Sequence, residues 1–161
     1  MRNLISRLFS LFVLLFVAIS CTDSSLIPVA GFWNGGFDGS PSDPNVVMKP
    51  EWKYRGFLQL YVTDMKFKMH LESEVQIVDV TGTWEKKKNK IYVIPKDVQF
   101  DDKGGRLLQK PGVTPLDPDV VKKACSQELV FAYTDNPQEL KGLEITFGPM
   151  LGRFDFSKGR E

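Results

Sequence analysis

The sequence is poor in the residues that most often build catalytic and metal centres. Its 161 residues include one histidine and two cysteines. A single histidine excludes a site with several histidine ligands, and neither cysteine stands in a spacing typical of metal ligands. The chain also lacks a nucleophile elbow and a phosphate-binding loop. We therefore expect no metal, no cofactor and no enzymatic activity.

The chain has no excess of charge of either sign. It carries 21 basic and 20 acidic residues. Residues 1–20 contain Arg2 and Arg7 and no acidic residue, so their removal leaves 19 basic and 20 acidic residues, a formal charge of −1. Proteins that bind nucleic acid usually carry a basic surface patch. We therefore expect no nucleic-acid partner.

Long hydrophobic runs are also missing. The apolar run that follows Arg7 covers residues 8–19 and is interrupted by Ser10. Twelve residues at about 1.5 Å each reach about 18 Å, which is short of the roughly 30 Å core of a bilayer. This length and the preceding arginines are typical of a secretory signal peptide, which we place at residues 1–20.

The end of the signal peptide and the residue after it read Ala18-Ile19-Ser20-Cys21, which resembles the lipobox of bacterial lipoproteins. The resemblance implies that Cys21 becomes the acylated first residue, with residues 21–29 as the acylated cysteine and its tether. Several acyl chains, at about 0.8 kcal/mol per buried CH₂, would anchor the protein permanently in a membrane. Thr22 stands where lipoproteins retained in the inner membrane carry aspartate, so we expect the periplasmic side of the outer membrane. Ordinary cleavage near Ala18 to Ser20 is the alternative.

Residues 30–157 alternate between apolar and polar side chains with the period of a β-strand. The clearest segment places Phe67 and Met69 on one face and Lys68 and His70 on the other. Short turns separate most of these segments, which predicts an all-β domain that closes into an eight-stranded antiparallel up-and-down barrel, with a β-sandwich as the alternative. The eight expected strands cover residues 31–37, 58–62, 65–71, 75–84, 92–100, 129–133, 143–147 and 152–156.

Several local signals refine this prediction. The strand over residues 75–84 changes phase near Asp79, which predicts a bulge there or a strand that is buried on both faces, and Pro95 predicts an edge position or a local irregularity in the next strand. Residues 38–50 contain three prolines and predict a long loop. Asp117 is a good N-cap and is followed by proline, so we expect one short helix to begin there. Residues 158–161 are expected to form a polar tail.

The first strand begins with Gly31-Phe32-Trp33, which resembles the G-x-W motif of the lipocalins. Thr81-Gly82-Thr83-Trp84 and the charged turn after it look like the mid-barrel hairpins of small bacterial lipocalin-like lipoproteins. The resemblance implies a calycin barrel that carries a small hydrophobic molecule. It also implies that Arg153, on the last strand, packs over Trp33 and closes one end of the barrel. The T-D-Y motif of the lipocalins is absent.

Two groups of residues have both a functional and a structural explanation. The large side chains of the expected interior line a ligand cavity in one explanation and form an ordinary packed core in the other. These side chains are Trp33, Met65, Phe67, Met69 and Trp84. A cluster of four lysines marks a hairpin tip that either contacts anionic lipid headgroups or is simply solvated. It consists of Lys86, Lys87, Lys88 and Lys90.

Cys125 and His70 are the one pair that chemistry would suggest for nucleophilic catalysis. Cys125 lies at the end of the expected helix, where a buried structural thiol is the favoured interpretation. His70 falls on the polar face of its strand, where a solvated side chain is favoured. The pair therefore does not change our expectation that the chain is not an enzyme.

Two functional hypotheses follow from the sequence. In the first, a membrane-anchored lipoprotein of the cell envelope holds a small hydrophobic ligand or a lipid inside a lipocalin-like barrel. In the second, the barrel is filled, and the protein has a structural or interaction role in which loops, especially residues 38–50, contact an envelope protein. An internal pocket of about 300 Å³ or more would favour the first hypothesis.

Overall fold

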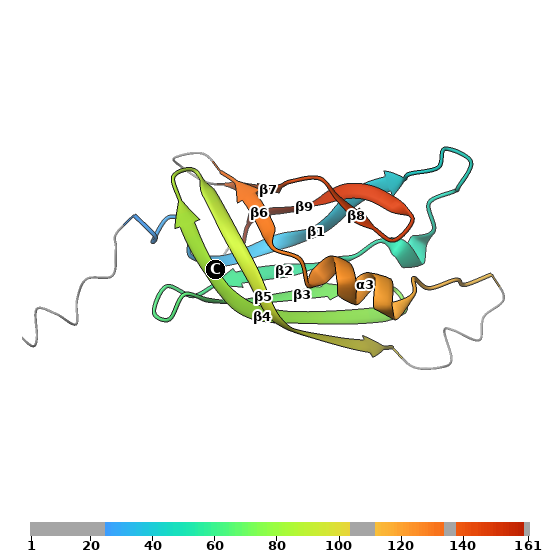
Figure 1. The fold of residues 1–161 in the computed structure, drawn as a ribbon, viewed down its shortest axis with the longest axis horizontal. Helices are drawn as coiled ribbons and strands as arrows, with labels where there is room; N and C mark the ends of the chain where they lie inside the picture. Colours follow the sequence, from blue (N-terminus) through green and yellow to red (C-terminus); the bar gives the residue numbers. More distant parts are fainter. Residues whose placement is uncertain (1–24, 104–111, 134–137, 160–161) are drawn as a thin grey trace, which may run out of the picture.

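The computed structural model describes residues 25–103, 112–133 and 138–159. Cys21, Thr22 and the expected signal peptide lie outside these ranges. The secondary structure is mostly β with one α-helix (Figure 1). The strands are β1 (Gly31–Pro41), β2 (Arg55–Leu60), β3 (Lys66–Glu72), β4 (Gln76–Lys87), β5 (Lys90–Asp102), β6 (Leu129–Ala132), β7 (Glu139–Gly142), β8 (Ile145–Phe147) and β9 (Met150–Lys158), and the helices are the 3₁₀ turn η1 (Pro50–Trp52) and α3 (Pro118–Cys125).

Eight strands form a closed antiparallel barrel. Each strand from β1 to β7 pairs with the next, β7 pairs with β9, and β9 closes the barrel against β1. This is the predicted up-and-down barrel, consistent with a lipocalin-like fold, and the β-sandwich alternative is wrong. Because every connection joins neighbouring strands, the meander closes without a crossover.

The ninth strand, β8, continues the line of β7 along one edge of β9. Lys141 pairs with Asp155, and Ile145 pairs with Gly152. Moving four residues along the β7–β8 segment therefore corresponds to moving three residues along β9, so this segment carries one extra residue. The expected strand over residues 143–147 is thus only the second half of this segment. Its first half, β7, has a single large apolar side chain, Leu140, which is too little to produce an alternating pattern.

Inward-facing side chains fill the barrel. The largest of them are almost completely buried, and each contributes about 1.5–3 kcal/mol relative to an exposed position. They come from all parts of the wall, so the core is continuous from one end of the barrel to the other. They are Trp33, Trp84, Tyr54, Phe67, Phe131, Phe147, Phe154, Phe156, Leu58, Leu60, Met69 and Leu71.

The two ends of the barrel are closed differently (Figure 1). We call the end at which β1 begins and the β4–β5 turn lies the N-terminal end. It is covered by the turn over residues 25–29, in which Val29 is fully buried. The other end, the helix end, is covered by η1 and α3. The side chain of Asp117 caps α3 at the backbone N–H of Asp119, as predicted, and Val121 and Cys125 pack inward.

Some local predictions were wrong. The wall has no bulge near Asp79; the register shift lies between Thr81 and Gly82, and the extra residue is Lys96 on β5, next to Pro95. The bulge changes the phase of β5, so Ile91 and Val93 point inward, whereas the pattern had placed Tyr92 and Ile94 in the register of the inward-facing Val98 and Phe100. Residues 38–41, expected in a loop, extend β1, and Lys158, expected in the tail, ends β9.

Candidate binding surfaces

The residues expected to line a ligand cavity lie in the packed interior. Trp33 and Met69 have no exposed surface, and Phe67 and Trp84 are 2% exposed. Met65 lies in the β2–β3 turn with a positive φ of 51° and packs against the same core. Four of the five side chains are therefore almost completely buried.

The predicted pair of Trp33 and Arg153 is wrong. Lys158, and not Arg153, covers the indole of Trp33, with its Nζ 4.5 Å from the ring centroid. The backbone register explains this arrangement, because Lys158 is the direct partner of Trp33 across β1 and β9, whereas Arg153 is opposite Asp38. Arg153 points outward and pairs with Asp155 at 2.8 Å. A cation therefore lies over the indole of Trp33, as expected, but the cation is Lys158 and not Arg153.

A pocket of about 460 Å³ lies on the outer wall near the N-terminal end. We call it the lysine groove. Its walls are mostly apolar, and three lysines and one aspartate border it. It is formed by the β2–β3 turn and by strands β3, β4 and β5, through Tyr61, Asp64, Lys66, Phe67, Lys68, Thr81, Gly82, Thr83 and Lys96.

The lysine groove follows from the irregularity of β5. The bulge at Lys96 bends the strand where it passes Gly82, and bulges are known to re-aim side chains in this way. A side chain at Gly82 would place its Cβ 2.2 Å from the carbonyl oxygen of Ile94 and 2.7 Å from the ring of Phe67. Glycine is therefore required for this close approach, which brings the ring of Phe67 to the floor of the groove.

The three lysines of the groove differ in how they are neutralised. Lys66 pairs with Asp64 at 2.8 Å, and the carboxylate raises the pKa of the lysine. Lys68 lies 3.8 Å from Asp79, beyond hydrogen-bonding distance. Lys96 has no ion-pair partner among the described residues. The groove thus combines apolar walls with positive charge that its own residues do not fully compensate.

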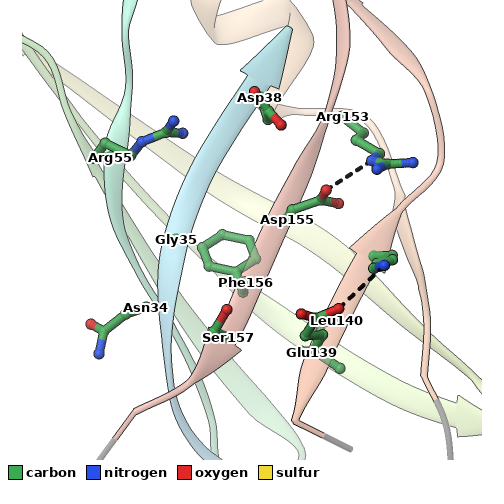
Figure 2. A pocket seen from close by; sticks show the side chains of 11 residues that line it. Asn34, Gly35, Asp38, Arg55, Glu139, Leu140, Arg153, Asp155, Phe156 and Ser157 are labelled. Carbon is green, nitrogen blue, oxygen red and sulfur yellow. Dashed lines mark hydrogen bonds and ion pairs between the residues drawn. The ribbon is translucent and has the colours of Figure 1, made fainter.

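A second pocket, of about 340 Å³, lies on the outer wall of β1, β7 and β9 (Figure 2). Its charges largely satisfy one another. Arg153 pairs with Asp155, Lys141 lies 3.2 Å from Glu139, and the guanidinium of Arg55 donates to the carbonyl oxygen of Phe37. This internally neutralised surface offers less attraction for an ion than the lysine groove does.

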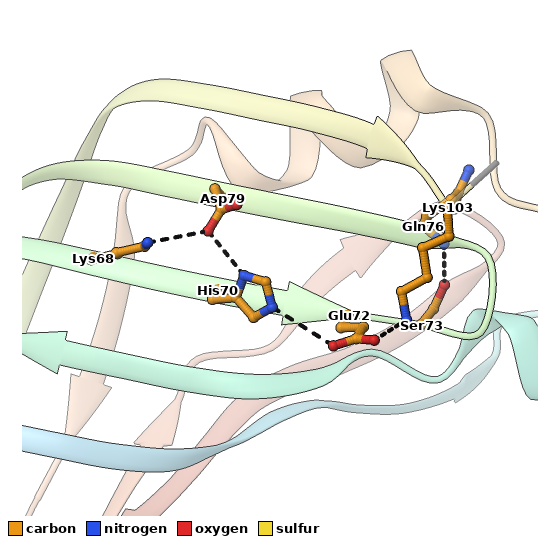
Figure 3. Close-up of polar contacts among 7 residues, drawn as sticks. All are labelled: Lys68, His70, Glu72, Ser73, Gln76, Asp79 and Lys103. Atoms are coloured by element: carbon orange, nitrogen blue, oxygen red, sulfur yellow. Dashed lines mark hydrogen bonds and ion pairs between the residues drawn. The ribbon is translucent and has the colours of Figure 1, made fainter.

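His70 lies at the centre of a polar cluster on the outer wall of β3 and β4 (Figure 3). Its Nδ1 is 2.9 Å from Asp79, its Nε2 is 3.8 Å from Glu72, and its ring stacks on Phe57. Lys103 contacts Glu72 and lowers the pKa of that carboxyl group. The histidine lies on the polar face, as predicted, but only 26% of its side chain is exposed.

Cys125 is a buried thiol, as the sequence suggested. Cys125 is the last residue of α3 and its side chain is buried, which raises the pKa of the thiol to about 12. The thiolate is therefore not populated at neutral pH. Because the cysteine faces the core and His70 faces outward, the two do not form a nucleophile pair.

Neither a metal centre nor a membrane-crossing helix is found in the described part of the chain. No group of three or more histidine, cysteine, aspartate or glutamate side chains within it is arranged to hold a metal ion. Among the helices formed by the described residues, none is long and apolar enough to cross a membrane.

Sequence reasoning missed the lysine groove because its residues come from four separate segments. The one local signal was Pro95, which marked an irregularity without showing which surface it would shape. Comparison with known proteins adds no further candidate: no family model, no curated protein and no solved structure matches the chain.

Proposed function

We propose that this protein is a lipid-anchored, non-enzymatic binding protein of the cell envelope, and that its ligand is a small amphipathic molecule with an apolar body and an anionic group. The lysine groove is the observation that carries the proposal. At about 460 Å³ it falls within the size range of small-molecule sites, about 300–1,000 Å³. The sequence predicted a small hydrophobic ligand or a lipid inside the barrel. We place a lipid-like ligand in a groove on the outer wall instead.

The chemistry of the groove supports this class of ligand. Its apolar walls and the ring of Phe67 favour a hydrocarbon body, because burial of apolar surface contributes about 25 cal/mol per Å². Lys68 and Lys96 supply ammonium groups for a carboxylate or phosphate, and charge-assisted hydrogen bonds are stronger than neutral ones. A fatty acid fits both requirements.

The packed interior supports placing the ligand outside. Met69 and Trp84, at different levels of the barrel, have almost no exposed surface. A ligand of fatty-acid size would have to displace several such side chains, and each displacement forfeits dispersion contacts in a close-packed core. The outer groove needs no such rearrangement.

Titration of the protein with a fluorescent fatty acid tests the proposal. We expect saturable binding that the methyl ester of the same probe does not reproduce, because the ester lacks the negative charge. Lys68→Gln with Lys96→Gln should weaken binding about tenfold, which corresponds to about 1.4 kcal/mol. Thr81→Trp should fill the groove and abolish binding, and it should leave the melting temperature unchanged because Thr81 is exposed.

Met69→Trp is the matched control, since it adds the same side chain to the interior. Overpacking of a filled core costs about 1–3 kcal/mol, so this variant should melt earlier but still bind the probe well below its melting temperature. Loss of binding in Met69→Trp together with retained binding in Thr81→Trp would return the ligand to the interior.

The filled core also favours a second candidate function, a rigid barrel that contacts an envelope protein. The segment suggested by the sequence, residues 38–50, still ends in a loop at the helix end, where Val47 is 80% exposed. Absence of probe binding, combined with cross-linking of an envelope protein to Val47→Cys, would favour this candidate over ligand binding.

A further inference from the structure

The lysine-rich hairpin lies beside the start of the described chain. Lys86 donates a hydrogen bond from its Nζ to the carbonyl oxygen of Ser25, at 2.7 Å. The two residues are 61 positions apart in the sequence. The hairpin tip that joins β4 to β5 therefore projects from the N-terminal end of the barrel, next to the point where the chain enters it (Figure 1).

The proposed anchor limits how far this end can be from a membrane. Ser25 lies four positions after Cys21, and an extended chain spans at most about 3.3–3.6 Å per position, which gives about 14 Å. If Cys21 is acylated, as the proposed function assumes, the N-terminal end must stay within about this distance of the lipid headgroups. The helix end lies at the opposite end of the barrel, farther from this anchor (Figure 1).

Two tyrosines, Tyr133 and Tyr92, contact residues of the hairpin. The hydroxyl of Tyr133 donates to the carbonyl oxygen of Lys88, and Lys86 lies over the Tyr133 ring at 5.7 Å. Lys87, on the same strand as Lys86, lies over the ring of Tyr92 on the other strand of the hairpin, at 5.1 Å. The tip is thus held in one position and does not need to be ordered by a partner.

The charge of this tip is only partly neutralised. Lys87 contacts Glu85, but the side chains of Lys88 and Lys90 have no acidic partner among the described residues. Apolar side chains accompany them at the same end: Ile27 is 61% exposed and Tyr61 is 39% exposed. Lysines beside exposed apolar and tyrosine side chains are typical of surfaces that lie in the headgroup region of a membrane.

We propose that the N-terminal end of the barrel docks on the surface of an anionic phospholipid bilayer, with Lys88 and Lys90 on headgroup phosphates. This inference rests on the anchor in the proposed function and adds to it a fixed orientation. The lysine groove lies on the wall at the same end, so docking would place its opening close to the bilayer that supplies an anionic lipid.

The test uses the full-length acylated protein in phosphatidylcholine vesicles with and without phosphatidylglycerol. A fluorophore is attached at Asn89→Cys on the hairpin tip or at Val47→Cys in the loop at the helix end. Quenchers are carried on lipid headgroups. We expect quenching at position 89 in anionic vesicles, little at position 47, and less at position 89 when salt shortens the screening length from about 10 Å to about 3 Å.

Charge substitutions sharpen the test. Lys88→Gln with Lys90→Gln should lower the ratio of docked to undocked protein at least about fivefold. The matched control is Lys53→Gln with Lys123→Gln, two exposed lysines at the helix end whose side chains make no contact that these changes would break. The control should leave quenching unchanged. The unsubstituted parent should take no label, because Cys125 is fully buried and Cys21 would be acylated.

The outcomes separate the inference from the anchor. Protein that floats with vesicles and carries the acyl mass, but shows no quenching at position 89, overturns docking and leaves the anchor intact. Quenching that ignores both the lysine substitutions and the anionic lipid overturns the role of the hairpin. A free thiol at Cys21 overturns anchor and docking together. Binding of a fluorescent fatty acid is measured independently of all three results.

Discussion

The two ends of the barrel use the same chemistry at very different sequence separations. At the N-terminal end, the indole of Trp33 donates to the carbonyl oxygen of Val29, four residues away, at 3.0 Å. At the helix end, the indole of Trp52 donates to the carbonyl oxygen of Thr114, 62 residues away, at 2.8 Å. In both cases a buried tryptophan fastens a segment outside the barrel across its opening.

The helix end adds a network of hydrogen bonds that involves buried polar side chains. The carboxylate of Glu51 accepts from the backbone N–H of Thr114, and the amide of Gln76 donates to the carbonyl oxygen of Leu116, each at 2.8 Å. The hydroxyl of Tyr54 donates to Gln76, and burial raises the pKa of this tyrosine far above its ordinary value. The N-terminal end thus combines apolar packing with hydrogen bonds to backbone carbonyl groups, from the indole of Trp33 and the ammonium group of Lys158, whereas the helix end adds hydrogen bonds among buried side chains.

The largest expected loss of stability comes from a substitution at the N-terminal end. Trp33→Ala removes a side chain with no exposed surface, and truncation of a buried tryptophan costs about 3–5 kcal/mol. Chemical denaturation would measure the free energy of unfolding. Ile27→Ala is the control at the same end; because Ile27 is 61% exposed, its cost should stay within about 0.5 kcal/mol. Similar costs for the two variants would mean that Trp33 does not close this end.

A smaller effect is expected at the helix end. Gln76→Leu removes the glutamine that accepts from the hydroxyl of Tyr54 and donates to the carbonyl of Leu116, which should cost about 1–3 kcal/mol. Adding Tyr54→Phe removes the hydroxyl that lost this acceptor, so the double variant should be more stable than the sum of the single effects predicts. Strict additivity in this cycle would show that the two side chains do not act as a network.

Hydrogen exchange provides a local measure of the same network. In Gln76→Leu, exchange at residues 112–117 should rise more than exchange at residues 25–31, because the glutamine fastens only the helix end. Equal increases at both ends would indicate general destabilisation instead.

The elements that the sequence predicted correctly are those with a local pattern. Strands, the closed barrel and the capped start of α3 follow from local periodicity and capping, and these predictions were confirmed. The phase of β5 was wrong because a bulge inserts one residue without changing composition, and Pro95 marks the irregularity but not its direction. β7 was missed because its only large apolar residue is Leu140.

The candidate sites were harder to predict than the fold. The lysine groove joins four segments, and the network around Gln76 joins residues 40 and 22 positions apart, so neither has a local signature. The sequence indicated two candidate surfaces, the loop over residues 38–50 and the lysine hairpin, because each is a continuous segment of the chain. The position of the lysine hairpin beside Ser25 required the structure.

The smallest expected losses of stability come from two substitutions that test which cation covers Trp33 at the N-terminal end. Lys158→Met keeps the aliphatic stem over Trp33 but removes the charge and the hydrogen bond that its Nζ donates to the carbonyl oxygen of Ala30, so it should cost about 1–2 kcal/mol. Arg153→Ala should change stability by less than about 0.5 kcal/mol, because its partner Asp155 forms only an exposed ion pair with it. Tryptophan fluorescence should shift in Lys158→Met and stay constant in Arg153→Ala. The lipocalin pattern predicts the reverse order for both measurements, since it assigns the arginine of the last strand to the tryptophan. An effect of Arg153→Ala larger than that of Lys158→Met would therefore restore that pattern and remove the distinction between this barrel and the lipocalins at its N-terminal end.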